Sequence, residues 1–234
     1  MKAMKIALAA AAATVALSGA AMAQELKLSY NVGVTSDYVF RGVSQTQEDP
    51  AVQGGVDLTY GVGYAGVWAS NVDFGTKDPS AEIDLYAGVR PTVGDTSLDF
   101  GVLYYGYSKD KGGASDTGLG SFSYVEVKAA ASRTFGPATL GAAVYYSPEF
   151  PAKGGSATYV EGNAAVPIAK KITLSGALGR QAIKNYKDYT TWNLGVSYAL
   201  TDHLSADLRY FDTDEHSLGN IYDSRVAVSL KAAF

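Results

Sequence analysis

The sequence predicts an all-β fold: a twelve-stranded antiparallel up-and-down transmembrane β-barrel that follows a cleaved signal peptide. Three observations lead to this fold class. Apolar and polar residues alternate with a period of two through most of the chain, long and short connections alternate between these segments, and aromatic residues gather at the segment ends. A period of two is typical of a strand with one apolar and one polar face.

The N-terminal segment, residues 1–23, has the features of a secretory signal peptide. Lys2 and Lys5 precede an apolar run from Ile6 to Leu17, and the segment ends in Ala21-Met22-Ala23. This A-x-A pattern predicts cleavage before Gln24. A membrane anchor is the alternative, but the apolar run is short against the ~20 residues that a spanning helix needs. We therefore expect an exported protein whose barrel occupies residues 24–234.

The composition excludes several functions. The chain of 234 residues contains no Cys, which excludes disulfide frameworks, thiol catalysis and Cys-based zinc sites. Its formal net charge of −4 argues against nucleic acid as a partner, because phosphate binding needs a basic face. The 26 Gly and 17 Tyr favour extended, turn-rich structure over helices. No cofactor is implied.

The first strand is predicted from Leu28 to Arg41, where Tyr30 and Val32 on one face alternate with Asn31 on the other. Clear alternation predicts further strands at Glu82–Arg90, Leu98–Tyr105, Val125–Ala131, Trp192–Leu200, Leu204–Tyr210 and Arg225–Phe234. Weaker alternation predicts the remaining strands at Val52–Tyr60, Tyr64–Phe74, Leu140–Tyr146, Val160–Val166 and Ile172–Leu178. In the third strand, either Val67 or Trp68 could face outward.

The connections fall into two classes that alternate along the chain. The longer ones are Ser44–Pro50, Gly75–Ser80, Ser108–Ser121, Ser147–Ser156, Ala182–Tyr189 and Asp212–Ile221. The shorter ones are Gly61–Gly63, Pro91–Thr96, Phe135–Pro137, Pro167–Lys171 and Thr201–Asp202. Long loops outside and tight periplasmic turns are typical of outer-membrane barrels. An even number of strands then places both ends of the barrel in the periplasm.

A soluble barrel or sandwich is the alternative fold, in which the apolar faces would form a core. The aromatic residues favour the membrane barrel, because girdles at both interfaces are typical of it. The inner girdle is predicted to contain Tyr30, Tyr60, Tyr198 and Phe234, and the outer girdle Tyr38, Phe40, Tyr104, Tyr146, Trp192 and Tyr210.

A terminal Phe on an alternating strand is the usual ending of proteins delivered to the outer-membrane assembly machinery, and the chain ends in Phe234. The expected partners are therefore outer-membrane lipid, periplasmic chaperones and the barrel-assembly machinery, the last two through Phe234. The expected location is the bacterial outer membrane.

Two segments resemble signatures of a known family. The segment from Asn31 to Thr46, which contains Ser36-Asp37-Tyr38-Val39-Phe40-Arg41-Gly42, is similar to the opening signature of the TorF family of proteobacterial proteins, which are named as porins. The segment from Tyr64 to Phe74 resembles the family's second signature. The resemblance implies an outer-membrane β-barrel with a pore. It implies no substrate and no catalytic residues.

Charged residues lie on the face opposite the lipid, because an Arg or Lys that faces lipid near the midplane would cost ~2–4 kcal/mol. The predicted lumen-lining residues are Asp37, Arg41, Asp57, Glu82, Asp84, Arg90, Asp99, Glu126, Lys128, Glu161, Asp207, Arg209, Arg225 and Lys231. Two interpretations stay open: a hydrated channel whose charges set selectivity, or an interior plugged by ion pairs and tyrosines. Asp37 and Arg41, four residues apart on one face, are predicted to form a structural ion pair or, alternatively, a gate.

Two sequence motifs have simpler interpretations than the functions they are known for. Gly61-Val62-Gly63-Tyr64-Ala65-Gly66 matches G-x-G-x-x-G, but strands are predicted on both sides, so it is a glycine-rich turn and no dinucleotide site. Asp212-Thr213-Asp214-Glu215 resembles the start of a calcium loop, but Ser217 stands where the loop needs Gly. A solvated acidic loop is the better interpretation, and weak binding of a divalent ion stays open.

An enzyme is not expected. Outer-membrane phospholipases also have twelve strands and carry a serine–histidine site, but neither His203 nor His216 has a nucleophile and an orienting partner across a predicted strand pair. The outer loop around Lys109 and Asp116 could instead serve in surface binding.

The sequence therefore predicts a monomeric or weakly associated porin through which small hydrophilic solutes diffuse passively. A non-conducting barrel with a structural or surface role is the main alternative. A lipid-modifying enzyme is the third.

Overall fold

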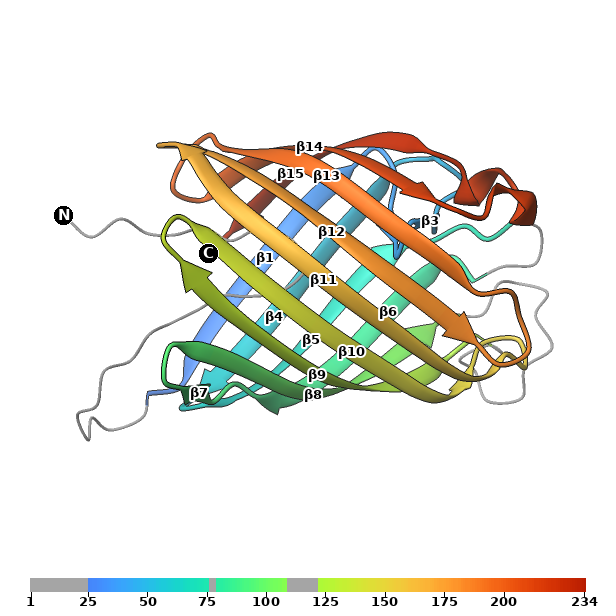
Figure 1. Ribbon diagram of the computed structural model, residues 1–234, viewed down its shortest axis with the longest axis horizontal. Coiled ribbons are helices and arrows are strands. Elements are labelled where there is room, and N and C mark those ends of the chain that lie inside the picture. Colours follow the sequence, from blue (N-terminus) through green and yellow to red (C-terminus); the bar gives the residue numbers. More distant parts are fainter. Residues whose placement is uncertain (1–24, 76–78, 109–121) are drawn as a thin grey trace.

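The computed structural model describes residues 25–75, 79–108 and 122–234. Twelve long antiparallel strands form a closed barrel, in which each long strand pairs with the next along the chain and the last pairs with the first (Figure 1). They are β1 (Lys27–Thr35), β4 (Ala51–Tyr60), β5 (Gly63–Asn71), β6 (Ala81–Val89), β8 (Thr96–Tyr107), β9 (Tyr124–Phe135), β10 (Ala138–Phe150), β11 (Gly155–Ala169), β12 (Ile172–Ile183), β13 (Tyr189–Ala199), β14 (Leu204–Thr213) and β15 (Arg225–Ala233). The predicted fold class is confirmed.

Closure of the barrel depends on the pairing of β1 with β15. Asn31 lies opposite Ala233, and Thr35 lies opposite Ser229. Beyond this ladder, the backbones of Tyr30 and Phe234 exchange two hydrogen bonds, with N–O distances of 3.0 and 2.9 Å. Because an open sheet edge in hydrocarbon would leave N–H and C=O groups without partners, closure is what allows strands to cross a bilayer.

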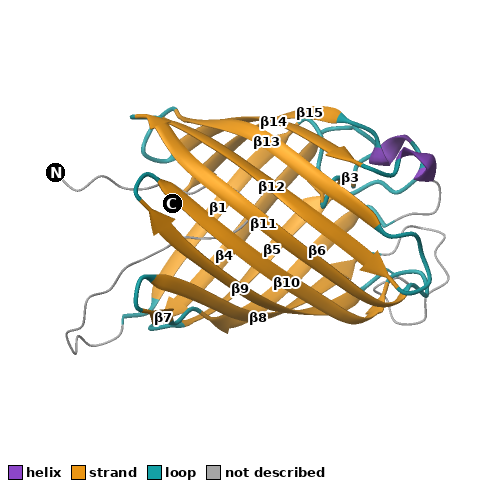
Figure 2. Ribbon diagram, viewed as in Figure 1, coloured by secondary structure: helices purple, strands orange, loops and turns teal. Residues whose placement is uncertain are grey.

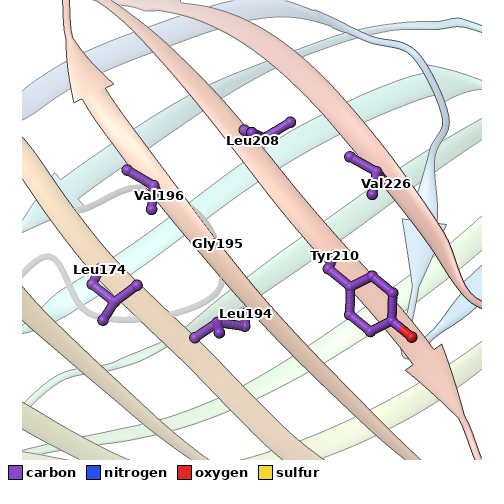
Figure 3. A pocket seen from close by; sticks show the side chains of 7 residues that line it. All are labelled: Leu174, Leu194, Gly195, Val196, Leu208, Tyr210 and Val226. Atoms are coloured by element: carbon purple, nitrogen blue, oxygen red, sulfur yellow. The ribbon is translucent and has the colours of Figure 1, made fainter.

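The outer wall of the barrel is apolar. Leu28, Leu85, Val102 and Leu208 point outward, and each exposes more than half of its surface. On β12 to β15, a shallow apolar depression in this wall is lined by Leu174, Leu194, Gly195, Val196, Leu208, Tyr210 and Val226 (Figure 3). Leucine and valine in such exposed bands are typical of a surface in contact with acyl chains.

The two ends of the barrel differ. Tight turns such as Gly61-Val62 and Gly136-Pro137, and the hairpin of β7 (Thr92–Val93) with the start of β8, lie at the end that carries the C-terminus. The longer connections lie at the other end, together with two short 3₁₀ helices, η1 (His216–Leu218) and η2 (Asn220–Tyr222) (Figure 2). The predicted loop Ser147–Ser156 is shorter than expected, because β10 runs to Phe150 and β11 begins at Gly155. Within the described part of the chain, no helix has the length and apolar character needed to span a membrane.

Some predictions fall on residues that are not described. The signal peptide, residues 1–23, lies outside the described residues, as does nearly all of the predicted outer loop Ser108–Ser121 with Lys109 and Asp116.

The predicted first strand is wrong beyond Thr35. After β1 the chain leaves the wall and forms a small hairpin of β2 (Val39–Phe40) and β3 (Val43–Ser44), which we call the inner hairpin. The two residues between these strands, Arg41 and Gly42, have φ of 49° and 82°. Two positive φ values in a two-residue loop fit a tight hairpin of type I′. The turn therefore begins at Arg41, where alternation alone had predicted a continuing strand.

The inner hairpin lies inside the barrel. Tyr38 packs edge-on against Trp68 of β5, and Phe40 packs against Tyr105 of β8, at centroid distances of 5.4 and 5.8 Å. A Cβ on Gly42 would lie 2.1 Å from Oγ1 of Thr191 on β13. Tyr38 and Phe40 are therefore part of the interior, and their predicted place in the outer aromatic girdle is wrong.

The position of Trp68 settles the orientation of β5. Trp68 points inward to Tyr38, and Val67 is the outward-facing residue. The other girdle residues follow the prediction at the inner end, where Tyr30, Tyr60, Tyr198 and Phe234 are exposed on the wall.

Candidate functional site

The candidate site is the charged interior of the barrel. The structure places the predicted lumen residues as follows: Asp37 and Arg41 on the inner hairpin and its entry, Asp57 on β4, Glu82 and Asp84 on β6, Arg90 directly after β6, Asp99 on β8, Glu126 and Lys128 on β9, Glu161 on β11, Asp207 and Arg209 on β14, and Arg225 and Lys231 on β15. Most of them belong to four groups, within each of which side chains are joined by ion pairs or hydrogen bonds or lie side by side on one strand.

Arg41 forms the first group at the tip of the inner hairpin. Its guanidinium donates two parallel hydrogen bonds to the Glu126 carboxylate, at 2.8 and 2.7 Å, and a third to Gln181 Oε1 at 3.0 Å. The rings of Tyr145 and Tyr159 lie 4.9 and 4.3 Å from the guanidinium carbon. A bidentate pair of this kind is among the strong charge-assisted contacts in proteins. Arg41 thus joins the hairpin tip to β9, β10, β11 and β12.

Asp37 forms the second group at the base of the same hairpin. Its carboxylate accepts hydrogen bonds from Ser44 and Thr46, at 2.7 and 3.1 Å, and from Arg225 of β15 at 3.1 Å. The predicted ion pair between Asp37 and Arg41 is therefore wrong. The two residues lie on one hairpin but bind opposite sides of the barrel wall, because the turn at Arg41 and Gly42 separates their side chains.

Glu82 and Asp84 form the third group, beside the hairpin on the inward face of β6. Tyr107 donates a hydrogen bond to Glu82 Oε1 at 2.9 Å. Both residues are more than nine-tenths buried, and within the part of the chain that the structure describes Glu82 Oε2 and Asp84 Oδ1 have no hydrogen-bond partner. Gln181 Nε2 is a third buried polar atom without a partner among the described residues. Buried polar atoms are nearly always paired, so three such atoms close to the inner hairpin mark this part of the interior as unusual.

The fourth group lies nearer the end with the tight turns. Asp99 accepts hydrogen bonds from Lys128 and Tyr64 at 2.7 Å each, and from Arg90 at 3.2 Å. The Arg90 guanidinium lies 3.9 Å from the centre of the Tyr64 ring. Tyr86 donates to Asp57 at 2.7 Å. These side chains are less buried than those around the hairpin.

Arg209 and Glu161 complete the polar lining. Arg209 pairs with Asp207 on its own strand at 3.0 Å and donates to Asn193 at 2.7 Å. Glu161 has no basic partner among the described residues and accepts hydrogen bonds from Tyr159 and Asn163, at 2.9 and 3.1 Å. Lys231 has no carboxylate within ion-pair distance in the described part of the chain.

The tyrosines that organise these charges were not among the residues predicted to line the lumen. Tyr64, Tyr86, Tyr105, Tyr107 and Tyr159 all point inward and donate to carboxylates. A signal was present for Tyr86, because it stands on the same alternating face as Glu82 and Asp84. Gln181 carried no such signal, because it lies beyond the predicted end of its strand.

The candidate calcium motif and His216, one of the two candidate histidines, lie at the end of β14 and in the outer loop that follows it. His216 Nε2 contacts Asp212 Oδ1 at 2.9 Å, and this hydrogen bond raises the pKa of the exposed imidazole. The Ser217 hydroxyl donates to Glu215, so it is not directed at His216. His203 lies at the opposite end and contacts the carbonyl of Ala233. Within the described residues, no group of three or more His, Asp or Glu side chains could hold a metal ion.

Comparison with solved structures identifies the fold. The barrel is similar to the KdgM porin in complex with disordered oligogalacturonate, with a TM-score of 0.61 at 10% identity, covering 88% of this chain and 98% of that one. The NanC porin gives a TM-score of 0.54 at 12% identity, over 88% and 98% of the two chains. The COG4313 outer membrane channel from Pseudomonas putida F1 gives 0.50 at 10% identity, over 93% and 99%.

A closed barrel with an apolar outer wall and a charged interior spans a membrane, and the barrels that share its fold are outer-membrane porins and channels. The chain accordingly has the fold of outer-membrane β-barrels. No curated protein matches it by sequence. The sequence profile of one family matches residues 19–234, and the chain therefore belongs to that family, Gcw_chp, which is described as a bacterial protein of unknown function.

Proposed function

We propose that the protein is an outer-membrane porin through which small hydrophilic solutes diffuse passively. The observation that carries the proposal is the sorting of side chains across the wall: charged residues and tyrosines face the interior, and leucine and valine face outward. Charges inside a barrel need water or one another, and those of the fourth group, around Asp99, are partly exposed to solvent. The resemblance of two segments to TorF porin signatures also supports the proposal.

In this function the inner hairpin sets the narrowest level of the pathway. It reaches from β1 across the interior to β9 and β12 through Arg41, and its base is held by Arg225. A constriction made by an inward-folded loop limits the size of the solute, whereas the charges around it set the preference for ions. Arg41 is then a candidate gate residue, because breaking its contacts would free the hairpin tip.

Acidic oligosaccharides are not the solute class that we propose. The KdgM structure is a complex with oligogalacturonate, a polyanion. In this chain four of the lumen cations, Arg41, Lys128, Arg209 and Arg225, are already paired with carboxylates of the protein and largely buried. Paired cations offer little to an anionic chain, so small neutral or cationic solutes fit better.

The second candidate function is a non-conducting barrel. It is favoured by the burial around the inner hairpin, where Asp37, Glu82, Glu126 and Gln181 are all shielded from solvent. Such a barrel would act as a structural or surface-interacting protein. We propose no catalytic role, since His216 binds Asp212 and Ser217 binds Glu215, which leaves no serine–histidine pair in this loop.

Reconstitution in planar lipid bilayers separates the two functions. A porin gives stepwise, ohmic conductance that scales with the amount of protein inserted. A protein that inserts, as judged by resistance to extraction at alkaline pH, but stays silent at high load would contradict the porin and support the non-conducting barrel.

We also propose that chaperones and the assembly machinery recognise the last strand through Phe234. The Phe234 ring is exposed on the wall and stacks on Tyr30 and on His203, with centroids 5.2 Å away in each case. The signal peptide over residues 1–23 belongs to the same export route.

A further inference from the structure

We infer that the lumen is cation-selective and that Glu82 and Asp84 on β6 are the residues that determine this selectivity. The inference deepens the proposed porin function and rests on it.

The first step concerns five basic side chains of the lumen, each of which is paired with a carboxylate. Arg41 pairs with Glu126 at 2.7 Å, Arg225 with Asp37 at 3.1 Å, and Arg209 with Asp207 at 3.0 Å. Lys128 and Arg90 share Asp99, at 2.7 and 3.2 Å. An anion in the lumen would have to compete with a carboxylate already in contact, and that carboxylate would repel it.

The second step concerns the carboxylates that have no basic partner in the described chain. Glu82 accepts a hydrogen bond from the Tyr107 hydroxyl, and Asp84 Oδ1 has no partner among the described residues. A phenol satisfies a hydrogen bond but supplies no positive charge. The free oxygens of Glu82 and Asp84 are buried acceptors on one face of one strand, two residues apart, so they point into the same region of the lumen.

The third step is the position of this pair, at the level of the inner hairpin. Asp84 lies opposite Tyr105 in the strand register, and Tyr105 packs on Phe40 of the hairpin and donates to Glu126. At this level the buried carboxyl groups of Asp37, Glu82, Asp84 and Glu126, together with the half-exposed Glu48 at 3.7 Å from Arg225, outnumber the guanidiniums of Arg41 and Arg225. The hairpin level therefore has an excess of acidic groups, and the buried members of this excess are Glu82 and Asp84.

These three steps predict the direction of selectivity. A solute that passes the hairpin crosses a narrow region with low-dielectric walls and a net negative charge, where the field of each carboxylate is poorly screened. A cation is attracted by the acidic groups that no guanidinium or ammonium neutralises, and chloride is repelled. Lys231, which has no carboxylate partner in the described chain, lies toward the end of β15 opposite to Arg225 and is therefore not at this level.

The test is the reversal potential of single channels in a KCl gradient across a planar bilayer. We expect the wild-type protein to prefer K⁺ over Cl⁻. The isosteric double variant Glu82→Gln/Asp84→Asn should lower the permeability ratio by about threefold or more, the factor that one unit charge about 7 Å away exerts on a monovalent ion in bulk water. Glutamine can still accept the Tyr107 hydrogen bond, so the variant keeps the contacts that fold the strand.

The matched control is Asp95→Asn/Asp188→Asn, which also removes two carboxylates but at exposed positions outside the lumen, next to Arg133 and Arg180. It should leave the ratio unchanged. A wild-type preference for Cl⁻, or a ratio in Glu82→Gln/Asp84→Asn equal to that of the control, would overturn the inference and leave the porin standing. Absence of any conductance would overturn the porin itself, and the inference with it.

Discussion

Arg41 and Glu126 lie 85 residues apart in the sequence, yet their side chains meet inside the barrel through two hydrogen bonds of 2.8 and 2.7 Å. Both groups are almost fully buried. The contact fixes the tip of the inner hairpin against β9 and places a loop across the interior of the barrel. Truncating one member of a buried pair leaves the other charge without a partner, which costs about 3–5 kcal/mol.

Arg41→Ala should therefore release the hairpin and raise single-channel conductance. The Glu126 carboxylate would lose its cation and draw water into the hairpin level. Arg180→Ala is the control, because it removes an exposed guanidinium that pairs with Asp188 at the outer end of β12. Equal conductance in wild type, Arg41→Ala and Arg180→Ala would show that Arg41 holds no gate.

Gly42→Ala should destabilise the hairpin through a steric clash. Its Cβ would lie 2.1 Å from Thr191 Oγ1 and 2.8 Å from Thr213 Cγ2, and φ at this position is 82°. Strain of this kind costs of order 1–3 kcal/mol. Gly136→Ala has a similar positive φ of 58° but open space around the new Cβ, so it isolates the cost of φ alone. Thermal unfolding should show a larger loss for Gly42→Ala, and equal losses would contradict the packing of the hairpin against β13 and β14.

Leu208→Arg should weaken folding into a bilayer by about 2–4 kcal/mol, the cost of a cation on the lipid face near the midplane. Leu208 is exposed in the middle of β14 and borders the apolar depression of Figure 3. Val93→Arg is the control, because Val93 is also exposed but lies in the β7 turn at the barrel end. Reversible denaturant titration in lipid vesicles measures the free energy of unfolding of both variants. A similar cost at the two positions would argue that the wall around Leu208 does not face acyl chains.

The pH response of the outer loop should follow His216. Its hydrogen bond to Asp212 raises the imidazole pKa above the ordinary value of about 6.5. The stabilising contribution is therefore full below that ordinary value and is lost as the pH rises through the raised pKa. Asp212→Asn should lower the His216 pKa, which an NMR titration of the imidazole reports. An unchanged titration would mean that the two side chains are not in contact in solution.

Phe234→Ala should reduce delivery to the outer membrane while leaving the lumen intact. The variant removes the terminal ring but keeps the β1–β15 ladder. The measurement is the amount of protein in outer-membrane fractions. Phe135→Ala is the control, because it removes another exposed ring, at the tight turn between β9 and β10. Equal amounts of the two variants would contradict the proposed role of Phe234.

The barrel itself was predictable from the sequence because a strand exposed to lipid on one side and to charge on the other has to alternate. At β14, for example, Leu208 faces outward and Asp207 and Arg209 face inward, and this alternation is enough to predict the strand and its orientation in the wall. The inner hairpin was not predictable in the same way. Its residues continue the alternation of β1, and only the Arg41-Gly42 turn, with its positive φ values, breaks it.

The pairing of charges depended on information that one sequence does not contain. Arg41 meets Glu126, and Asp37 meets Arg225, because strand register and barrel closure bring distant segments together. The predicted pairing of Asp37 with Arg41 rested on their closeness in the sequence. The turn at Arg41 and Gly42 instead directs the two side chains to different strands. Inward tyrosines such as Tyr64 and Tyr159 were missed because an aromatic residue fits a lipid interface as well as a polar lumen.

The central claim is that the charged face of the wall encloses water and the apolar face touches lipid, and cysteine labelling tests it most directly. The natural chain has no Cys, so single cysteines report one position each. We compare Asp57→Cys with Leu58→Cys, neighbours on β4 with opposite orientations. In protein folded into lipid vesicles, a small membrane-impermeant thiol reagent should modify Asp57→Cys and spare Leu58→Cys. Modification of Leu58→Cys with protection of Asp57→Cys would contradict the account.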